Sequence, residues 1–139
     1  MAQLNPYLTF NGTCREAMSF YRDCLGGQVV DLMTFAQSPM AEGMPAELQD
    51  RVLHSRLEVG GMELMGSDTP SDQPASQGGS VTLCLNSPDK EEITRYFEKL
   101  SDGATITQPL METFFGLYGA LTDKYGIAWM FQAGGNPDA

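Results

Sequence analysis

The sequence predicts an α+β fold in which paired β-α-β-β-β modules form a cupped mixed sheet with the helices outside. Three observations lead to this prediction: an internal repeat, one amphipathic helix in each repeat, and strand-like segments after each helix. A chain of 139 residues is the size of one globular domain. We therefore expect a single domain, 1–139, built from two repeats, about 1–68 and 79–133, joined by a linker at 67–79 that is rich in Ser, Asp, Pro, Gln and Gly.

The repeat is clearest where each half begins. Leu8 to Asn11 aligns with Leu83 to Asn86 at an offset of 75 residues. The same offset aligns three helix positions: Met18 with Ile93, Tyr21 with Tyr96, and Leu25 with Leu100. Towards the end of each half the offset falls to 65, where Gly61 aligns with Gly126. The first half thus has about ten extra residues, which we place in the loop around 38–49.

Both helices have start and stop signals. In the first, Thr13 and Glu16 have the spacing of a capping box, and Gly26-Gly27 ends the apolar pattern. In the second, Ser87 is the expected N-cap, and Pro88 occupies the first helical position. The sequence therefore predicts helices over about 14–25 and 88–100.

The segments after each helix are typical of strands. In the first half, we expect a strand at 28–35 and a hairpin of 52–59 with 62–67, turning at Gly60-Gly61. In the second half, we expect a strand at 105–106, an irregular Gly-punctuated stretch at 113–119, and a hairpin of 120–124 with 127–132. That second hairpin is expected to turn at Tyr125-Gly126.

Charge and composition exclude several classes of function. The chain has 18 acidic and 8 basic side chains, a net charge of −10 and a pI of about 4.3, so nucleic acid and anionic membranes are not expected partners. There is no apolar run near the ~20 residues of a membrane span and no signal-peptide pattern, which predicts a soluble cytoplasmic protein. The three cysteines lack a Cys-x-x-Cys pair, and we expect them to be small buried side chains.

Strand alternation gathers one set of polar side chains on a single face. In the hairpin, Ser55, Leu57 and Val59 are expected to face the helix, which leaves His54, Arg56 and Glu58 on the concave face. A two-residue turn then sets three pairs opposite each other: Glu58 with Glu63, Arg56 with Met65, and His54 with Ser67. By the same parity Trp129 belongs to the core. The concave face is the only constellation in this sequence that could carry chemistry.

Two interpretations of this face remain open. In the structural one, Arg56 bridges Glu58 and Glu63, while His54 only hydrogen-bonds Ser67. In the functional one, His54 and Arg56 are the candidate catalytic residues. The candidate ligand-binding residues of both halves are Tyr7, Thr9, Glu58, Glu63, Met65, Thr82, Cys84, Phe114, Tyr118 and Met130. Phe114 and Tyr118 are included because irregular sequence around them could wall a pocket.

Four motifs carry a resemblance to a known family. They are Asn5-Pro-Tyr-Leu-x-Phe-Asn-Gly, Phe20-Tyr with Cys24-Leu-Gly-Gly, His54-x-Arg-Leu-x-x-Gly-Gly-x-x-Leu-Met-Gly-Ser-Asp68, and Leu121-Thr-Asp-x-x-Gly-x-x-Trp-Met130. Together they span nearly the whole chain. The chain resembles the PhnB-like branch of the glyoxalase, bleomycin-resistance and extradiol-dioxygenase group, the vicinal oxygen chelate superfamily. The resemblance implies a glyoxalase-like fold around a cavity, and a homodimer.

The resemblance also implies where metal-using members place their ligands. Those positions fall close to Asn5, Met65, Ser80 and Met130, and none of these is an imidazole or carboxylate suited to a divalent transition metal. We therefore expect no metal and no cofactor. Some members are described as ubiquinone-pathway methyltransferases, but the sequence lacks a glycine-rich strand-to-helix turn for a nucleotide-like cofactor.

Three functions are compatible with these features. The leading hypothesis is small-molecule binding in the sheet cup without a complete metal site, favoured for cationic or amphipathic compounds by the acidic balance. The alternative is a metal-dependent lyase, isomerase or dioxygenase of the same superfamily that uses His54. A purely structural or partner-binding protein is a third hypothesis, with no positive signal beyond the expected homodimer.

Overall fold

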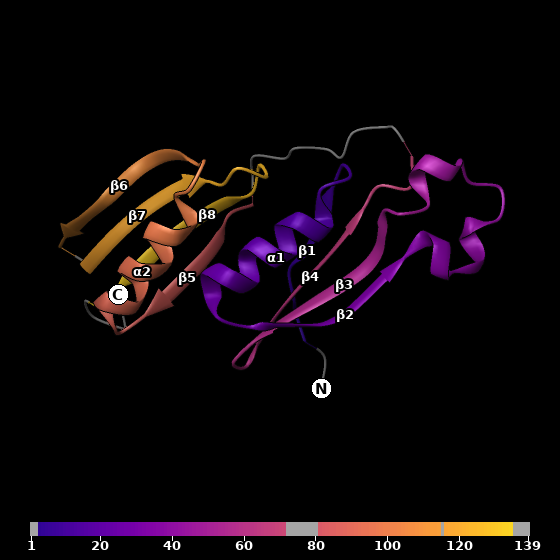
Figure 1. The fold of residues 1–139 in the computed structure, drawn as a ribbon. Coiled ribbons are helices and arrows are strands. Elements are labelled where there is room, and N and C mark those ends of the chain that lie inside the picture. The colour runs from indigo at the N-terminus through magenta and orange to yellow at the C-terminus, as the bar shows by residue number, and fades with distance from the viewer. Residues whose placement is uncertain (1–2, 72–80, 115, 135–139) are drawn as a thin grey trace. The chain divides into compact units, whose positions relative to one another are not determined.

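The chain folds as two compact units, residues 1–76 and 77–139. The computed structural model describes residues 3–71, 81–114 and 116–134. In each unit, one helix packs on a four-stranded mixed sheet (Figure 1). The prediction of an α+β fold with two β-α-β-β-β modules is thereby confirmed. Residues 72–79 of the predicted linker lie outside the described residues.

The first unit follows the predicted order of elements. Its elements are β1 (Tyr7–Phe10), α1 (Cys14–Leu25), β2 (Gln28–Thr34), β3 (Val52–Val59) and β4 (Met62–Asp68). The strands lie in the order β1-β4-β3-β2, with β1 parallel to β4 and the other neighbours antiparallel. The extra loop of this unit contains three short 3₁₀ helices, Phe35–Gln37, Pro39–Ala41 and Ala46–Leu48. The hairpin turns at Gly60-Gly61, as predicted.

The second unit repeats this topology. Its elements are β5 (Leu83–Ser87), α2 (Lys90–Leu100), β6 (Thr105–Thr113), β7 (Gly116–Thr122) and β8 (Ala128–Ala133), in the order β5-β8-β7-β6. The irregular stretch predicted at 113–119 is wrong, because β6 and β7 form a hairpin through it. The turn predicted at Tyr125-Gly126 is longer, from 123 to 127. The Asp123 carboxylate stabilises this longer turn by accepting hydrogen bonds from the backbone N–H groups of Tyr125 and Ile127.

The start of α1 is held by a residue from the far end of the module. The predicted capping box is wrong, because the Thr13 side chain makes no capping hydrogen bond. Instead, Asp68 at the end of β4 accepts hydrogen bonds from the backbone N–H groups of Gly12 and Cys14 at Oδ1, each 2.9 Å long. Its Oδ2 accepts a third, from the N–H of Val52 (2.9 Å). One buried carboxylate therefore ties β4 to the starts of both α1 and β3.

The start of α2 also differs from the prediction. The N-cap is Asp89 rather than Ser87, and its carboxylate accepts a hydrogen bond from the N–H of Glu91. The Ser87 hydroxyl accepts one from the N–H of Asp89, so Pro88 lies in a turn before the helix. The helix therefore begins two residues later than predicted.

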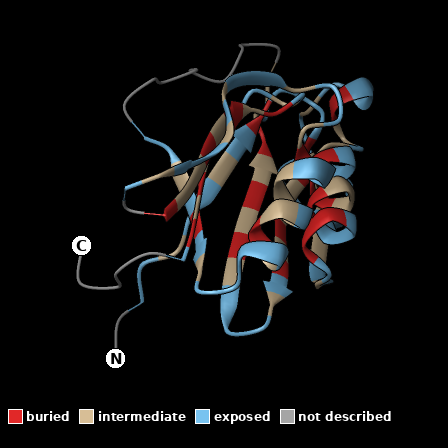
Figure 2. Ribbon diagram, turned by 90° about the vertical axis from the view of Figure 1, so that its left-hand side faces the viewer, coloured by how far each residue is buried: buried red, intermediate tan, exposed pale blue. Residues whose placement is uncertain are grey.

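The buried faces follow the predicted alternation, which Figure 2 shows as red positions recurring along the strands. Ser55 and Leu57 are fully buried, and Trp129 is 3% exposed, as expected of core residues. The helices contribute Ala17, Met18, Tyr21, Leu25, Ile93 and Leu100 to the two cores. Within the described residues, no helix is long and apolar enough to cross a membrane.

Candidate functional site

The predicted polar residues of the first unit gather on the sheet face that α1 does not cover. We call this the open face of the first sheet, and define it by Tyr7, Thr9, His54, Arg56, Glu58, Glu63 and Met65. The register pairs Glu58 with Glu63 and Arg56 with Met65, as predicted. On the other side of β4, Met65 pairs with Tyr7. Three strands thus bring these side chains together.

Arg56 lies at the centre of this face. Its Nη1 donates a hydrogen bond to Oε1 of Glu63 at 2.7 Å and lies 3.7 Å from Oε1 of Glu58. The hydrogen bond to Glu63 raises the pKa of the guanidinium, so Arg56 stays charged. All three side chains are partly exposed, and solvent-exposed ion pairs of this kind add little to stability.

Sequence reasoning missed a third carboxylate on this face. Asp31 of β2 pairs with Arg56 across the ladder, and Met33 pairs with His54. A register shift between Val29 and Asp31 interrupts the regular alternation of β2. The sequence of β2 alone therefore does not indicate on which side of the sheet Asp31 lies. The one weak signal is that this acidic residue stands among apolar ones.

His54 contacts a different partner from the one expected. The Tyr7 hydroxyl oxygen lies within hydrogen-bonding distance of Nδ1 of His54, at 3.1 Å, and the two rings are stacked with centroids 5.8 Å apart. The predicted hydrogen bond to Ser67 is thus replaced, because parallel pairing brings β1 next to β4 and its phenol within reach. Tyr7 remains 48% exposed, so the ring pair is open to solvent.

The predicted residues of the second unit are less concentrated. Cys84, Tyr118 and Met130 lie on the face of the second sheet that α2 does not cover, with Cys84 paired to Met130. Thr82 precedes β5, and Phe114 is fully exposed in the β6–β7 turn. Cys14 and Cys24 are buried as expected, but Cys84 is exposed, because its strand position faces away from the helix.

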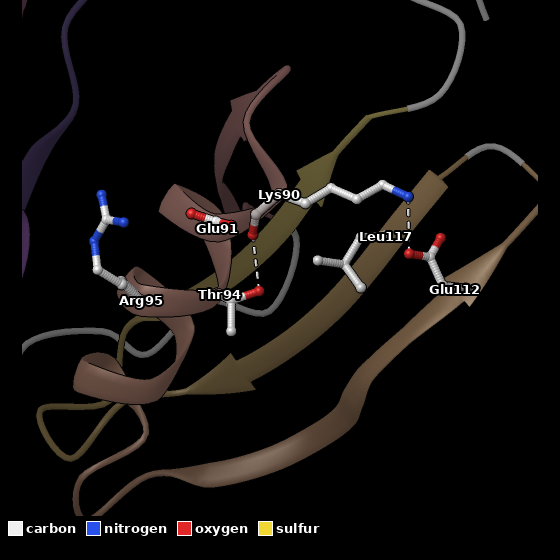
Figure 3. A pocket seen from close by; sticks show the side chains of 6 residues that line it. All are labelled: Lys90, Glu91, Thr94, Arg95, Glu112 and Leu117. Carbon is white, nitrogen blue, oxygen red and sulfur yellow. Dashed lines mark hydrogen bonds and ion pairs between the residues drawn. The ribbon is translucent and has the colours of Figure 1, made fainter.

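One cavity lies outside the predicted site. It has a volume of about 420 Å³ and is bounded by Lys90, Glu91, Thr94, Arg95, Glu112 and Leu117 (Figure 3). Nζ of Lys90 reaches over Leu117 to within 2.8 Å of Oε1 of Glu112. Two cations and two carboxylates line the cavity, so their charges cancel. The cavity therefore attracts neither cationic nor anionic ligands in preference.

The residues at the metal positions implied by the resemblance do not fit a divalent metal. Asn5, Met65 and Met130 offer an amide and two thioethers, while Ser80 lies outside the described residues. Across the described parts of the chain, no three His, Cys, Asp or Glu side chains are grouped so as to hold a metal ion.

Comparison with known proteins identifies the family. The sequence pattern of the 3-demethylubiquinone-9 3-methyltransferase family matches residues 2–132. The chain belongs to this family. It is also 33% identical over 138 residues to Protein YjdN of Escherichia coli K12, covering 93% of each chain. The PhnB-like branch predicted from the sequence motifs is thereby confirmed.

Solved structures show that this family member has the expected fold. Protein PA1353 of Pseudomonas aeruginosa is 38% identical, with a TM-score of 0.85 over 96% of this chain and 98% of that one. A putative 3-demethylubiquinone-9 3-methyltransferase, PhnB protein, of Bacillus cereus is 25% identical, with a TM-score of 0.78 over 95% and 99%. A glyoxylase/bleomycin resistance protein/dioxygenase domain of Frankia shares the fold, at 16% identity and a TM-score of 0.65 over 99% and 94%.

The described strand-to-helix turns do not fit a nucleotide-like methyl donor. Such cofactors bind at free backbone N–H groups of a helix start. At the start of α1, the N–H groups of Gly12 and Cys14 already donate to Asp68. The Gly26-Gly27 pair ends α1, and the N–H of Gly26 donates to the carbonyl of Arg22. No step through such a cofactor is derived.

Proposed function

We propose that this protein binds small organic cations on the open face of its first sheet, without a metal ion. The observation that carries the proposal is the charge balance around Arg56. Asp31, Glu58 and Glu63 surround one guanidinium, so these four side chains together carry a net charge of −2. A face of this charge attracts cations and repels anions.

The positions of the carboxylates support binding of a cation at Glu58. Glu63 is engaged by Arg56 at 2.7 Å, whereas Glu58 is a full ångström further away and its side chain is 48% exposed. Glu58 is therefore the carboxylate with most capacity for a second positive partner. Asp31 is exposed on the adjacent strand and adds to the same potential.

The aromatic pair supports a ligand that carries an apolar group. The stacked rings of Tyr7 and His54 lie on the same face as the charged residues, and Tyr7 is 48% exposed. Aromatic faces attract cations and pack against rings, at about 0.5–1 kcal/mol where they are exposed. The half-buried thioether of Met65 adapts to varied apolar shapes. A ring with a quaternary ammonium group matches both features.

The test uses three probes of similar size and different charge. Benzyltrimethylammonium, benzyl alcohol and benzoate are titrated by calorimetry into the native protein, and we expect binding in that order of strength. Glu58→Gln should weaken binding of the cation selectively, and Arg56→Ala should strengthen it. His54→Ala should weaken binding of all three probes, because it removes one ring of the aromatic pair.

Leu57→Ala serves as the control, because Leu57 is buried on the opposite side of β3 from Arg56. It should lower the free energy of unfolding by roughly 2–5 kcal/mol and leave the order of the three probes unchanged. The proposal fails if benzoate binds as well as the cation, or if Glu58→Gln leaves the affinity for the cation unchanged.

A further inference from the structure

The Asn11-Gly12 pair lies in the turn between β1 and α1, and both residues are exposed. Glycine suits this turn, because its φ of +100° is a conformation that residues with a Cβ rarely adopt. It also leaves the backbone nitrogen of residue 12 unshielded by a side chain, next to the side-chain amide of Asn11. We propose that the fold of the first unit catalyses deamidation of Asn11, through a cyclic succinimide closed by this nitrogen.

The reaction needs a base, because an amide nitrogen becomes a nucleophile only as it loses its proton. Oδ1 of Asp68 accepts a hydrogen bond from the N–H of Gly12 at 2.9 Å, so it is placed to take that proton. Asp68 is 4% exposed, and hydrogen bonds from the N–H groups of Cys14 and Val52 fix its position. The carboxylate is therefore a base already aligned on the nucleophile.

A hydrogen-bond donor lies at the other reacting group. When the nitrogen of Gly12 bonds Cγ of Asn11, negative charge develops on Oδ1 of Asn11. The Thr69 hydroxyl donates to this oxygen at 3.3 Å. The other acceptor near this hydroxyl, the carbonyl of Ser71, already accepts from Nη1 of Arg51 at 2.9 Å.

Arg51 supports the same charge from close by. Its Nη1 donates to Oγ1 of Thr69 at 3.1 Å, which makes the hydroxyl a stronger donor. A Cβ at residue 12 would lie 3.5 Å from Nη2, so the guanidinium is close to the reacting pair. Arg51 is therefore a positioning residue for Thr69, and its positive charge favours the anionic intermediate.

The reaction balances with solvent water as the only co-reactant. The nitrogen of Gly12 bonds Cγ of Asn11 and gives its proton to Asp68. The bond from Cγ to Nδ2 then breaks, and the proton on Asp68 leaves with Nδ2 as ammonia. Water opens the ring at either of its carbonyls, which gives aspartate or isoaspartate at this position. Both products add a carboxylate beside Arg51.

The test compares the folded chain with the unfolded chain. The native protein is incubated at neutral pH in buffer and in guanidinium chloride, and peptide mass spectrometry follows aspartate and isoaspartate formation at Asn11. The folded chain should react about tenfold faster or more, since a positioned general base contributes about 10²–10⁴-fold in enzymes. Thr69→Val should slow the folded reaction by about tenfold and leave the unfolded one unchanged.

Two controls accompany these measurements. Asn86, which precedes Ser87 in β5, is an exposed asparagine of the same chain and should react no faster folded than unfolded. Thr105→Val removes the hydroxyl of an exposed threonine in β6 of the second unit, and it should leave the rate at Asn11 unchanged.

Asp68→Asn should lower the rate in buffer to that of the unfolded chain. Thr69→Val leaves Asp68 in place, so it tests the site independently of the stability that Asp68 provides. Circular dichroism checks that each variant folds. The proposal is overturned if the folded native protein reacts no faster at Asn11 than the unfolded one. It is equally overturned if Thr69→Val reacts as fast as the native protein in buffer.

Discussion

Replacing Asp68 should destabilise the first unit more than the loss of one ordinary hydrogen bond. The carboxylate is 4% exposed and accepts three backbone N–H groups, those of Gly12, Cys14 and Val52. The hydrogen bonds from Cys14 and Val52 are buried, so water cannot replace their acceptor. Each buried N–H left without a partner costs about 1–3 kcal/mol. Asp68→Ala should therefore lower the free energy of unfolding by roughly 2–6 kcal/mol.

Asp68→Asn distinguishes the hydrogen bonds accepted by Oδ1 from the one accepted by Oδ2. Its amide oxygen can still accept from Gly12 and Cys14, but its NH₂ group then faces the N–H of Val52. We expect this variant to lose about 1–3 kcal/mol, less than the alanine variant. Urea unfolding followed by circular dichroism gives the three stabilities, with Asp50→Asn as an exposed control of equal charge change. A loss below 1 kcal/mol for Asp68→Ala would show that another group satisfies these amides.

Two further predictions concern pH and assembly. Burial raises the pKa of the Cys14 thiol from 9.0 to about 11, so above pH 9 the unfolded chain releases a proton that the folded chain retains. The free energy of unfolding should therefore fall by roughly 2–3 kcal/mol between pH 9 and 11. In urea unfolding, Cys14→Ala should lack this part of the decline. An identical decline in both proteins would contradict the prediction. We also predict a homodimer, because each sheet has edge strands whose backbone groups need partners or cover. Light scattering at tens of micromolar checks this, and a mass near the 15.2 kDa of one chain would exclude the dimer.

The sequence predicted those features that depend on near neighbours. The hairpin at Gly60-Gly61 fixes its own register, so the pairs of Glu58 with Glu63 and Arg56 with Met65 followed from turn length alone. The apolar stripe of the first helix likewise indicated Tyr21 and Leu25 as core residues. Such patterns repeat every two or about 3.6 residues, and a single strand or helix is long enough to show them.

Features that depend on distant residues were missed. Asp68 caps α1 from 54 residues away, and nothing near Thr13 indicates that its own side chain is not used. The longer β7–β8 turn arises because Asp123 binds the indole N–H of Trp129 as well as two backbone N–H groups. Asp31 joins the open face through an irregular register. In each case a polar side chain contacts a residue that the alternation of polar and apolar residues along the chain does not identify.

The parallel pairing of β1 with β4 constrains when the first module can fold during synthesis. Tyr7 is made 58 residues before its partner in the sheet, Met65. At about 5–20 residues per second, β1 waits roughly 3–12 s for the strand that gives it hydrogen-bonding partners. Asp68 is made last of all the residues of β4, so the start of α1 is also completed only then. The pairing of β1 and the capping of α1 are therefore both completed only after β4 has emerged, whereas the antiparallel pair of β2 with β3 depends on neither.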